Sequence, residues 1–114
     1  MVIRKPKILR SVQGLGLRRS EEVYLVGGAV RDFLLGKPPG KDFDFAVRGD
    51  VESLAKEAAR ETGGHAFPLG EAFGTWRVVL KQKRKRTELD FSSLQGKDIF
   101  EDLRQRDFTV NSIA

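Results

Sequence analysis

The chain contains no cysteine, one histidine and no long apolar run. Without cysteine, neither a disulfide framework nor a thiolate metal site is possible. No apolar stretch approaches the roughly 18 residues that a membrane-spanning helix needs. The basic residues near the N-terminus are not followed by the apolar segment of a secretory signal. Together these absences favour a cytoplasmic protein without a membrane segment.

Low-complexity tracts and internal repeats are also missing, so residues 1–114 are expected to form one domain with a modest core. Charge, by contrast, is abundant: 21 Lys and Arg stand against 16 Asp and Glu, which gives a net charge of +5. This surplus suits a polyanionic partner such as nucleic acid. Many small domains are simply basic, however, so the charge alone leaves both interpretations open.

Apolar periodicity predicts an alternation of helices and strands. Helices are expected over residues 6–16, 29–35, 51–62 and 99–104, with another beginning at 107–114. Strands are expected over residues 23–26, 42–47, 65–69, 75–81 and 86–91, the last two forming a hairpin. This order predicts an α+β (mixed α/β) fold, with a small mixed or antiparallel sheet and helices packed on one side. The apolar C-terminal turn lacks a Gly or Pro stop, which predicts that the chain is a fragment of a longer protein.

Local signals mark the ends of two of these helices. Asp50 is an expected N-cap, and the pair Gly63-Gly64 is expected to end the helix that Asp50 begins. In the first helix, Gly14 and Gly16 are expected to mark a frayed C-terminal end. These signals predict the helix boundaries.

Two aspartates, Asp42 and Asp44, alternate with phenylalanines in the strand predicted over 42–47. Side chains two residues apart on a strand point to the same face, with Cα atoms roughly 6.5–7 Å apart. Carboxylates placed in this way can share hard divalent cations such as Mg²⁺. Two such ions activate an attacking hydroxyl and stabilise a departing pyrophosphate. An isolated Asp-x-Asp is nevertheless more typical of the solvent face of a strand.

Three further features favour the functional interpretation. Gly27-Gly28 lies between a predicted strand and helix, where backbone N–H groups and the helix dipole attract phosphates. Arg31 follows in the first helical turn and can add a fixed charge at the β- or γ-phosphate. Asp90 lies in a strand pattern that can pair beside the first strand and supply a third carboxylate. Taken alone, the glycines indicate a turn and Asp90 a surface acid.

Three common nucleotide or metal motifs are excluded by the residues around the glycine pair and the aspartates. No Gly-Lys-Ser/Thr follows the glycines, so a Walker loop is absent. Ala46 and Val47 stand where an EF-hand needs a ligand and a glycine. The third spaced glycine of a Rossmann fingerprint is missing after the glycine pair, so this motif is absent as well. The remaining pattern is a phosphate-binding turn followed by carboxylates.

Four motifs occur in order along the chain. They are Leu25-Val26-Gly27-Gly28-Ala29-Val30-Arg31-Asp32, Lys41-Asp42-Phe43-Asp44-Phe45, Phe73-Gly74-Thr75 and Glu101-Asp102-Leu103-Arg104-Gln105-Arg106-Asp107-Phe108-Thr109-Val110-Asn111. This set resembles the catalytic head domain of class II tRNA nucleotidyltransferases (the CCA-adding enzymes) and of the similar bacterial poly(A) polymerases, both in the DNA polymerase beta superfamily. The resemblance covers roughly residues 20–114.

The resemblance implies a role for each matching residue. Asp42 and Asp44 would bind the catalytic Mg²⁺ ions, two in number, with Asp90 as the third carboxylate. The triphosphate would be held by Gly27, Gly28 and Arg31. The remaining implied contacts, to the triphosphate and sugar of the nucleotide, come from Arg106, Asp107 and Asn111. Read from the residues alone, the last segment is a helix cap at Asp107 beside a solvated Arg106.

The resemblance also implies partners and an activity. A protein of this kind transfers CMP and AMP from CTP and ATP to a tRNA 3′ end without a nucleic-acid template. The family motif that reads the nucleobase, and the neck, body and tail domains, lie beyond Ala114, so the chain alone is expected to have weak or no turnover. Poly(A), CC-only and A-only addition remain alternatives, as does a non-catalytic nucleotide- or RNA-binding module of the same fold.

Three features lie outside these motifs. Residues 81–86 hold five basic residues, for which a solvent-exposed hairpin tip is the favoured interpretation and contact with RNA phosphates the alternative. His65 is expected to begin a strand rather than bind a metal. Trp76 is expected to pack in the core, because it alternates with Val78 and Leu80.

Overall fold

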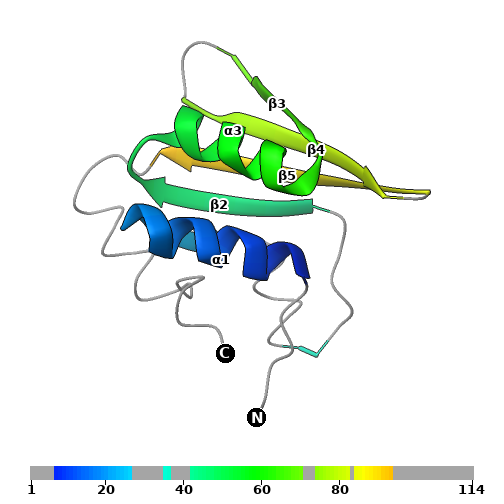
Figure 1. Cartoon of the computed structure of the whole chain (residues 1–114), viewed down its shortest axis with the longest axis horizontal. Helices are drawn as coiled ribbons and strands as arrows, with labels where there is room; N and C mark the ends of the chain where they lie inside the picture. The colour runs from blue at the N-terminus through cyan, green and yellow to red at the C-terminus, as the bar shows by residue number, and fades with distance from the viewer. Residues whose placement is uncertain (1–6, 27–34, 37–41, 71–73, 83, 94–114) are drawn as a thin grey trace.

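A computed structural model describes residues 7–26, 35–36, 42–70, 74–82 and 84–93. These residues form a five-stranded mixed sheet with two helices on one of its faces (Figure 1). The elements are α1 (Lys7–Arg19), β1 (Glu22–Val26), β2 (Asp42–Arg48), α3 (Val51–Thr62), β3 (His65–Pro68), β4 (Trp76–Gln82) and β5 (Lys85–Ser93). The predicted fold class, a mixed sheet covered by helices on one side, is confirmed.

The strand order is β1-β2-β5-β4-β3. Strands β2 and β5 run parallel at the centre of the sheet, and every other neighbouring pair is antiparallel. The expected hairpin is present as β4 and β5, with Gln82 opposite Lys85 at its closed end. This arrangement brings the strand that begins at Asp42 directly beside the strand that carries Asp90.

Alternation along the strands separates the core from the opposite face of the sheet. Apolar side chains of β1, β2, β4 and β5 point toward the helices, and α1 and α3 cover them with one apolar stripe each. The fully buried members include Leu9, Val12, Leu15, Val23, Leu25, Phe45, Leu54, Val78, Leu89 and Phe91. The polar positions of the same strands therefore lie on the face opposite the helices.

Helix α3 begins and ends where the sequence predicts. The Asp50 side chain accepts a hydrogen bond from the Ser53 amide, which satisfies one of the free N–H groups of the first turn. Gly63 adopts a left-handed conformation with φ of 76° and closes the C-terminus. Both predicted caps are confirmed.

Helix α1 is longer than expected, because the glycines do not end it. Leu15 and Gly16 are both buried in the helix, and the helix continues to Arg19. Ser20 then takes a left-handed φ of 55°, and the Glu21 amide donates to the Gly16 carbonyl at 2.9 Å. This is the hydrogen-bond pattern of a Schellman motif, with serine in the place that glycine usually occupies. The predicted frayed end at Gly14 and Gly16 is therefore wrong.

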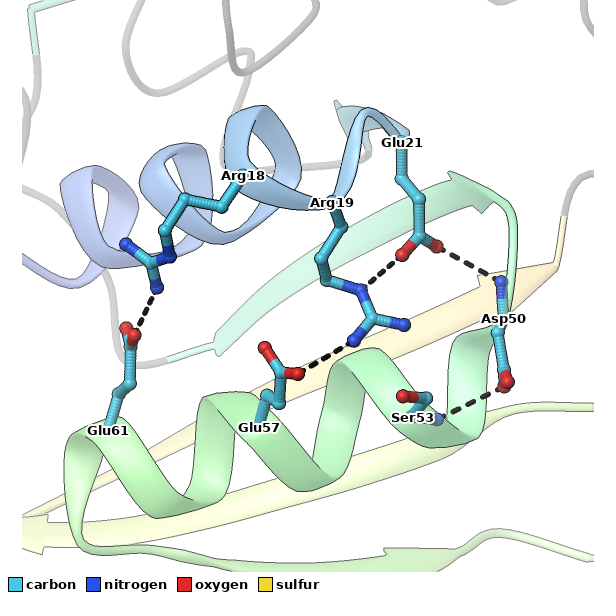
Figure 2. A network of polar contacts seen from close by, with 7 residues as sticks. All are labelled: Arg18, Arg19, Glu21, Asp50, Ser53, Glu57 and Glu61. Atoms are coloured by element: carbon cyan, nitrogen blue, oxygen red, sulfur yellow. Dashed lines mark hydrogen bonds and ion pairs between the residues drawn. The ribbon is translucent and has the colours of Figure 1, made fainter.

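An ion-pair network joins α1 to α3 and to the turn before α3 (Figure 2). Arg18 pairs with Glu61, and Arg19 pairs with both Glu21 and Glu57. The Glu21 carboxylate in turn accepts a hydrogen bond from the Asp50 amide at 3.0 Å. The network fixes the two helices to each other on the side away from the polar sheet face.

Of the expected helices, 99–104 and 107–114 lie outside the described residues, and so does 29–35 apart from Leu35. The expected strands are confirmed with ends shifted by one or two residues. Among the described helices, none is long and apolar enough to cross a membrane.

Candidate functional site

The centre of the polar sheet face carries four carboxylates on two adjacent strands. In the parallel pairing of β2 with β5, Asp44 lies opposite Asp90 and Asp42 lies opposite Glu88. Paired residues of adjacent strands share a face, and the strands are about 4.8 Å apart. The backbone register thus brings Asp42, Asp44 and Asp90 close together, as predicted, and adds Glu88 as a fourth acid.

Burial behind the carboxylates fixes this register. Phe43 and Phe45 are 3% and 1% exposed and point into the core between the aspartates. The Phe45 ring stacks on that of Phe91, with centroids 5.1 Å apart and an interplanar angle of 15°. A slip of one residue would send these rings to solvent and the carboxylates to the core. The core therefore determines which acids stand beside each other.

The clustering of like charges changes the acidity of Asp44. Partial burial raises the pKa of the Asp44 carboxyl above its ordinary value, and the charges of Asp90 and Asp42 raise it further. Arg77 acts in the opposite direction on the same pKa. The site therefore disfavours the accumulation of negative charge in the absence of a cation.

Arg77 on β4 is a cation that contacts two members of this acidic group. Its Nε donates to Oδ1 of Asp90 at 2.8 Å and its Nη2 to Oδ2 at 3.0 Å, while Nη1 lies 3.6 Å from a Glu88 oxygen. The bond to Asp90 raises the pKa of the Arg77 guanidinium further above its ordinary value. This bidentate arrangement is the strongest hydrogen-bonding geometry available to an arginine and a carboxylate.

Arg77 and Glu88 were not among the sequence-predicted site residues. The signal was present in part, because Arg77 alternates with the core residues Trp76 and Val78 and so must lie on the polar face. What the alternation could not supply was the register, which puts Arg77 opposite Asp90. Pairing partners are set by the tertiary arrangement of the strands rather than by their own sequences.

The carboxylate oxygens match the donor preference of Mg²⁺, which is bound by hard oxygen ligands. Within the described part of the chain, however, no group of three or more His, Asp or Glu side chains is arranged to hold a metal ion. Both oxygens of Asp90 accept hydrogen bonds from Arg77. The donor chemistry of these acids therefore fits a divalent cation.

The other predicted site residues lie outside the described part of the chain. They are Gly27, Gly28, Arg31, Arg106, Asp107 and Asn111. The one described link to them is Val26, the residue before the glycine pair, which ends β1 opposite Asp44. His65 begins β3, as expected, and its side chain is exposed. Trp76 packs against the core, also as expected, with the Lys56 ammonium 5.4 Å from its ring centroid.

Comparison with known proteins defines the class to which this fold and acidic sheet face belong. The family model described as "Poly A polymerase head domain" matches residues 23–114, so the chain belongs to that family.

Two curated relatives are tRNA nucleotidyltransferases. The chain is 45% identical over 91 residues to a CC-adding tRNA nucleotidyltransferase of Geobacter sulfurreducens, a match that covers 80% of the chain and 20% of the relative. It is 46% identical over 90 residues to an A-adding tRNA nucleotidyltransferase of Deinococcus radiodurans, covering 79% and 19%. The chain thus spans about a fifth of the length of these relatives.

A solved structure supports the same relationship. A tRNA nucleotidyltransferase complexed with a primer tRNA and an incoming ATP analogue superposes with a TM-score of 0.63 at 37% identity. The match covers 88% of this chain and 29% of that one.

Proposed function

We propose that the full-length gene product adds CMP and AMP from CTP and ATP to the 3′ end of tRNA in the cytoplasm, without a nucleic-acid template. The observation that carries this proposal is the register that stands Asp44 beside Asp90, with Asp42 on the same strand face. Membership of the family and the activities named for the relatives support the reaction type.

Asp42, Asp44 and Asp90 are the residues proposed to bind Mg²⁺, as two ions. When bound, these ions lower the pKa of the attacking 3′-hydroxyl and stabilise the departing pyrophosphate. The strand geometry supports this role because Asp42 and Asp44 share one face and their Phe neighbours are locked in the core. Arg77 offsets the repulsion among the acids, and Asp90 would hold a cation with oxygens that it now shares with Arg77.

The nucleotide is proposed to bind at the segment that follows β1. Gly27 and Gly28 would let the triphosphate approach the backbone, and Arg31 would neutralise it. Arg106, Asp107 and Asn111 would position the triphosphate and the sugar. The end of β1 at Val26, opposite Asp44, supports this division, because the glycine pair follows directly in the chain.

Which nucleotide is added, and how many times, is not determined by the described residues. The relatives include both CC-adding and A-adding enzymes, and the family model takes its name from poly(A) polymerases. CC-only, A-only and poly(A) addition are therefore the alternatives within the same chemistry.

A non-catalytic nucleotide- or RNA-binding module is the alternative from another class. The observation that favours it is the engagement of both Asp90 oxygens by Arg77, together with the absence of a three-ligand metal group among the described residues. The presence of all three aspartates favours catalysis, since a binding module has no need of them.

The test uses the full-length gene product, tRNA lacking its CCA end, and labelled CTP and ATP, supplied separately and together with Mg²⁺. We expect ordered addition that stops after CCA and is lost in the double variant Asp42→Ala/Asp44→Ala. Long A-tails from ATP alone would identify a poly(A) polymerase, and addition of C alone or A alone a specialised enzyme. No incorporation by folded protein would favour the binding module.

A further inference from the structure

The tip of the β4–β5 hairpin carries a concentration of exposed cations. Lys81, Arg84, Lys85 and Arg86 are exposed, and they are referred to below as the basic tip. Lys81 lies directly opposite Arg86, a like-charge pair that destabilises a sheet. Only Arg86 has an ion-pair partner among the described residues, namely Glu88 at 2.9 Å. A structural role alone would not favour this concentration of positive charge.

The basic tip lies at the same end of the sheet as Asp42, where β2 begins. Because β2 and β5 run parallel and Asp42 is opposite Glu88, Lys85 lies three residues before the level at which β2 begins. At about 3.3 Å per residue, this places the start of β5 about 10 Å beyond Asp42 along the strands. Figure 1 shows the closed end of the hairpin projecting past the start of β2. The sheet thus presents cations next to its acidic centre.

Two members of the basic tip, Lys81 and Arg86, share a face with the acids. Arg86, Glu88 and Asp90 alternate on β5, and Lys81 is paired with Arg86, so both cations belong to the polar face rather than the helix face. A polyanion whose reacting end lies at Asp42 and Asp44 would be repelled by the carboxylates and attracted by the tip. Attraction at this end would fix the direction in which such a chain leaves the site.

We propose that the basic tip binds backbone phosphates of the RNA whose 3′ end lies at Asp42 and Asp44. The inference rests on the proposed function for the identity of the polyanion. A separation of about 10 Å corresponds to about three nucleotides at one charge per 3.4 Å of strand. The tip therefore contacts the strand just behind the reacting end and does so without reading its sequence, because lysine and arginine heads meet phosphates and not base edges.

The experiment compares two charge-matched triple variants of the full-length gene product. Lys81→Gln/Arg84→Gln/Lys85→Gln removes three charges from the basic tip and leaves the Arg86–Glu88 pair in place. Lys7→Gln/Arg10→Gln/Arg60→Gln removes three exposed charges from α1 and α3, on the other side of the sheet. The affinity for labelled tRNA lacking its CCA end is measured by fluorescence anisotropy at several salt concentrations, and melting temperatures verify folding.

Each phosphate contact contributes about 0.7 to the slope of log affinity against log salt on a single strand. The slope measured for the tip variant should therefore be smaller in magnitude by about 2. Between 50 and 200 mM salt, the loss of affinity should then be about 20-fold smaller for the tip variant than for the unaltered protein. The control variant should keep the original slope. Steady-state addition should show a raised KM for tRNA with the KM for CTP unchanged.

An unchanged slope in the tip variant, or equal losses in the two variants, would overturn the inference. So would a raised KM for CTP with unchanged tRNA affinity, because the tip would then bind the nucleotide and not the RNA. The binding measurement needs no turnover. If the protein adds no nucleotide but the two variants still differ in slope, the proposed reaction fails and the phosphate contact stands. If addition proceeds and the slopes agree, only the contact fails.

Discussion

At the scale of single residues, Arg77 reduces the electrostatic repulsion among the four acids of the polar sheet face. It is bonded to both oxygens of Asp90 and lies 3.6 Å from Glu88. Its side chain is 29% exposed and that of Asp90 is 20% exposed, so the pair is partly screened by solvent. An arginine in this position both neutralises and orients the carboxylate, whereas a lysine would only neutralise it.

We expect Arg77→Met to lower the stability of the metal-free protein by about 1–2 kcal/mol, because partly buried carboxylates are left unpaired. The stability of Arg77→Lys should lie between that of the unaltered protein and that of Arg77→Met, because lysine keeps the charge but not the paired hydrogen bonds. The matched control is Arg86→Met, whose side chain is 58% exposed and pairs with Glu88; it should cost no more than about 0.5 kcal/mol. Urea unfolding in EDTA measures all three, and equal losses for Arg77→Met and Arg86→Met would contradict the special role of Arg77.

Asp44 gives a second prediction at this scale. Its folded-state pKa is raised from 3.8, so protonated Asp44 favours folding, and that contribution is lost as pH rises through the folded-state pKa. Asp44→Asn removes the charge and should therefore stabilise the protein at pH 7. Since much of the partly buried Asp44 remains accessible to solvent, the gain should be modest, at about 0.5 kcal/mol or roughly 2–4 °C.

The advantage of Asp44→Asn should shrink as pH falls toward 3.8, where the wild-type carboxyl becomes protonated. Thermal melts in EDTA between pH 7.5 and 4 follow this change. A melting-temperature difference that stays constant over this range, or has the opposite sign at pH 7, would show that the repulsion among the carboxylates does not control Asp44.

At the scale of elements, the turn between β2 and α3 depends on Gly49. Its φ is 152°, and a Cβ built there would stand 2.0 Å from Oε2 of Glu21. That same carboxylate accepts from the Asp50 amide and pairs with Arg19. The glycine therefore lets α1, through Glu21, approach the start of α3 closely enough to join the two.

Gly49→Ala should accordingly destabilise the fold by about 2 kcal/mol, through backbone strain and displacement of Glu21. Gly70→Ala is the control, because Gly70 also has a positive φ, 122°, but a Cβ there would have no atom within 4 Å. The difference between the two melting temperatures isolates the contact with Glu21. Similar losses at the two glycines would mean that strain alone accounts for the effect.

The elements also show what a sequence can and cannot predict. Strand β2 and helix α3 were predictable because alternation and caps are local signals, as the Asp50 and Gly63 conformations show. The end of α1 was not, because burial of Leu15 and Gly16 against the rest of the core outweighs the low helix propensity of glycine. The shared strand face of Asp42 and Asp44 was predictable from their spacing, whereas the Arg77–Asp90 pair depends on which strands become neighbours.

At the scale of the whole molecule, the core and the acidic face are two sides of one sheet. The pairings that align the carboxylates on the polar side are accompanied by buried apolar pairs on the other side, Phe43 with Leu89 and the stacked rings of Phe45 and Phe91. The helices contribute to stability through the same core but do not touch the polar face. Two core substitutions that lower stability equally should therefore differ in their effect on the acidic face, according to which part of the core they change.

Phe91→Leu and Val12→Ala provide this comparison, since both side chains are fully buried and each change should cost roughly 1–2 kcal/mol. Val12 lies on α1, which packs against α3 and β1, whereas Phe91 follows Asp90 directly on β5. We expect the increase in melting temperature produced by Mg²⁺ with CTP to be retained in Val12→Ala and reduced in Phe91→Leu, because a loosened β2–β5 register no longer holds Asp44 beside Asp90. Equal responses in the two variants would mean that the backbone hydrogen bonds between the parallel strands suffice to align the acids, and that the aromatic stack contributes stability alone.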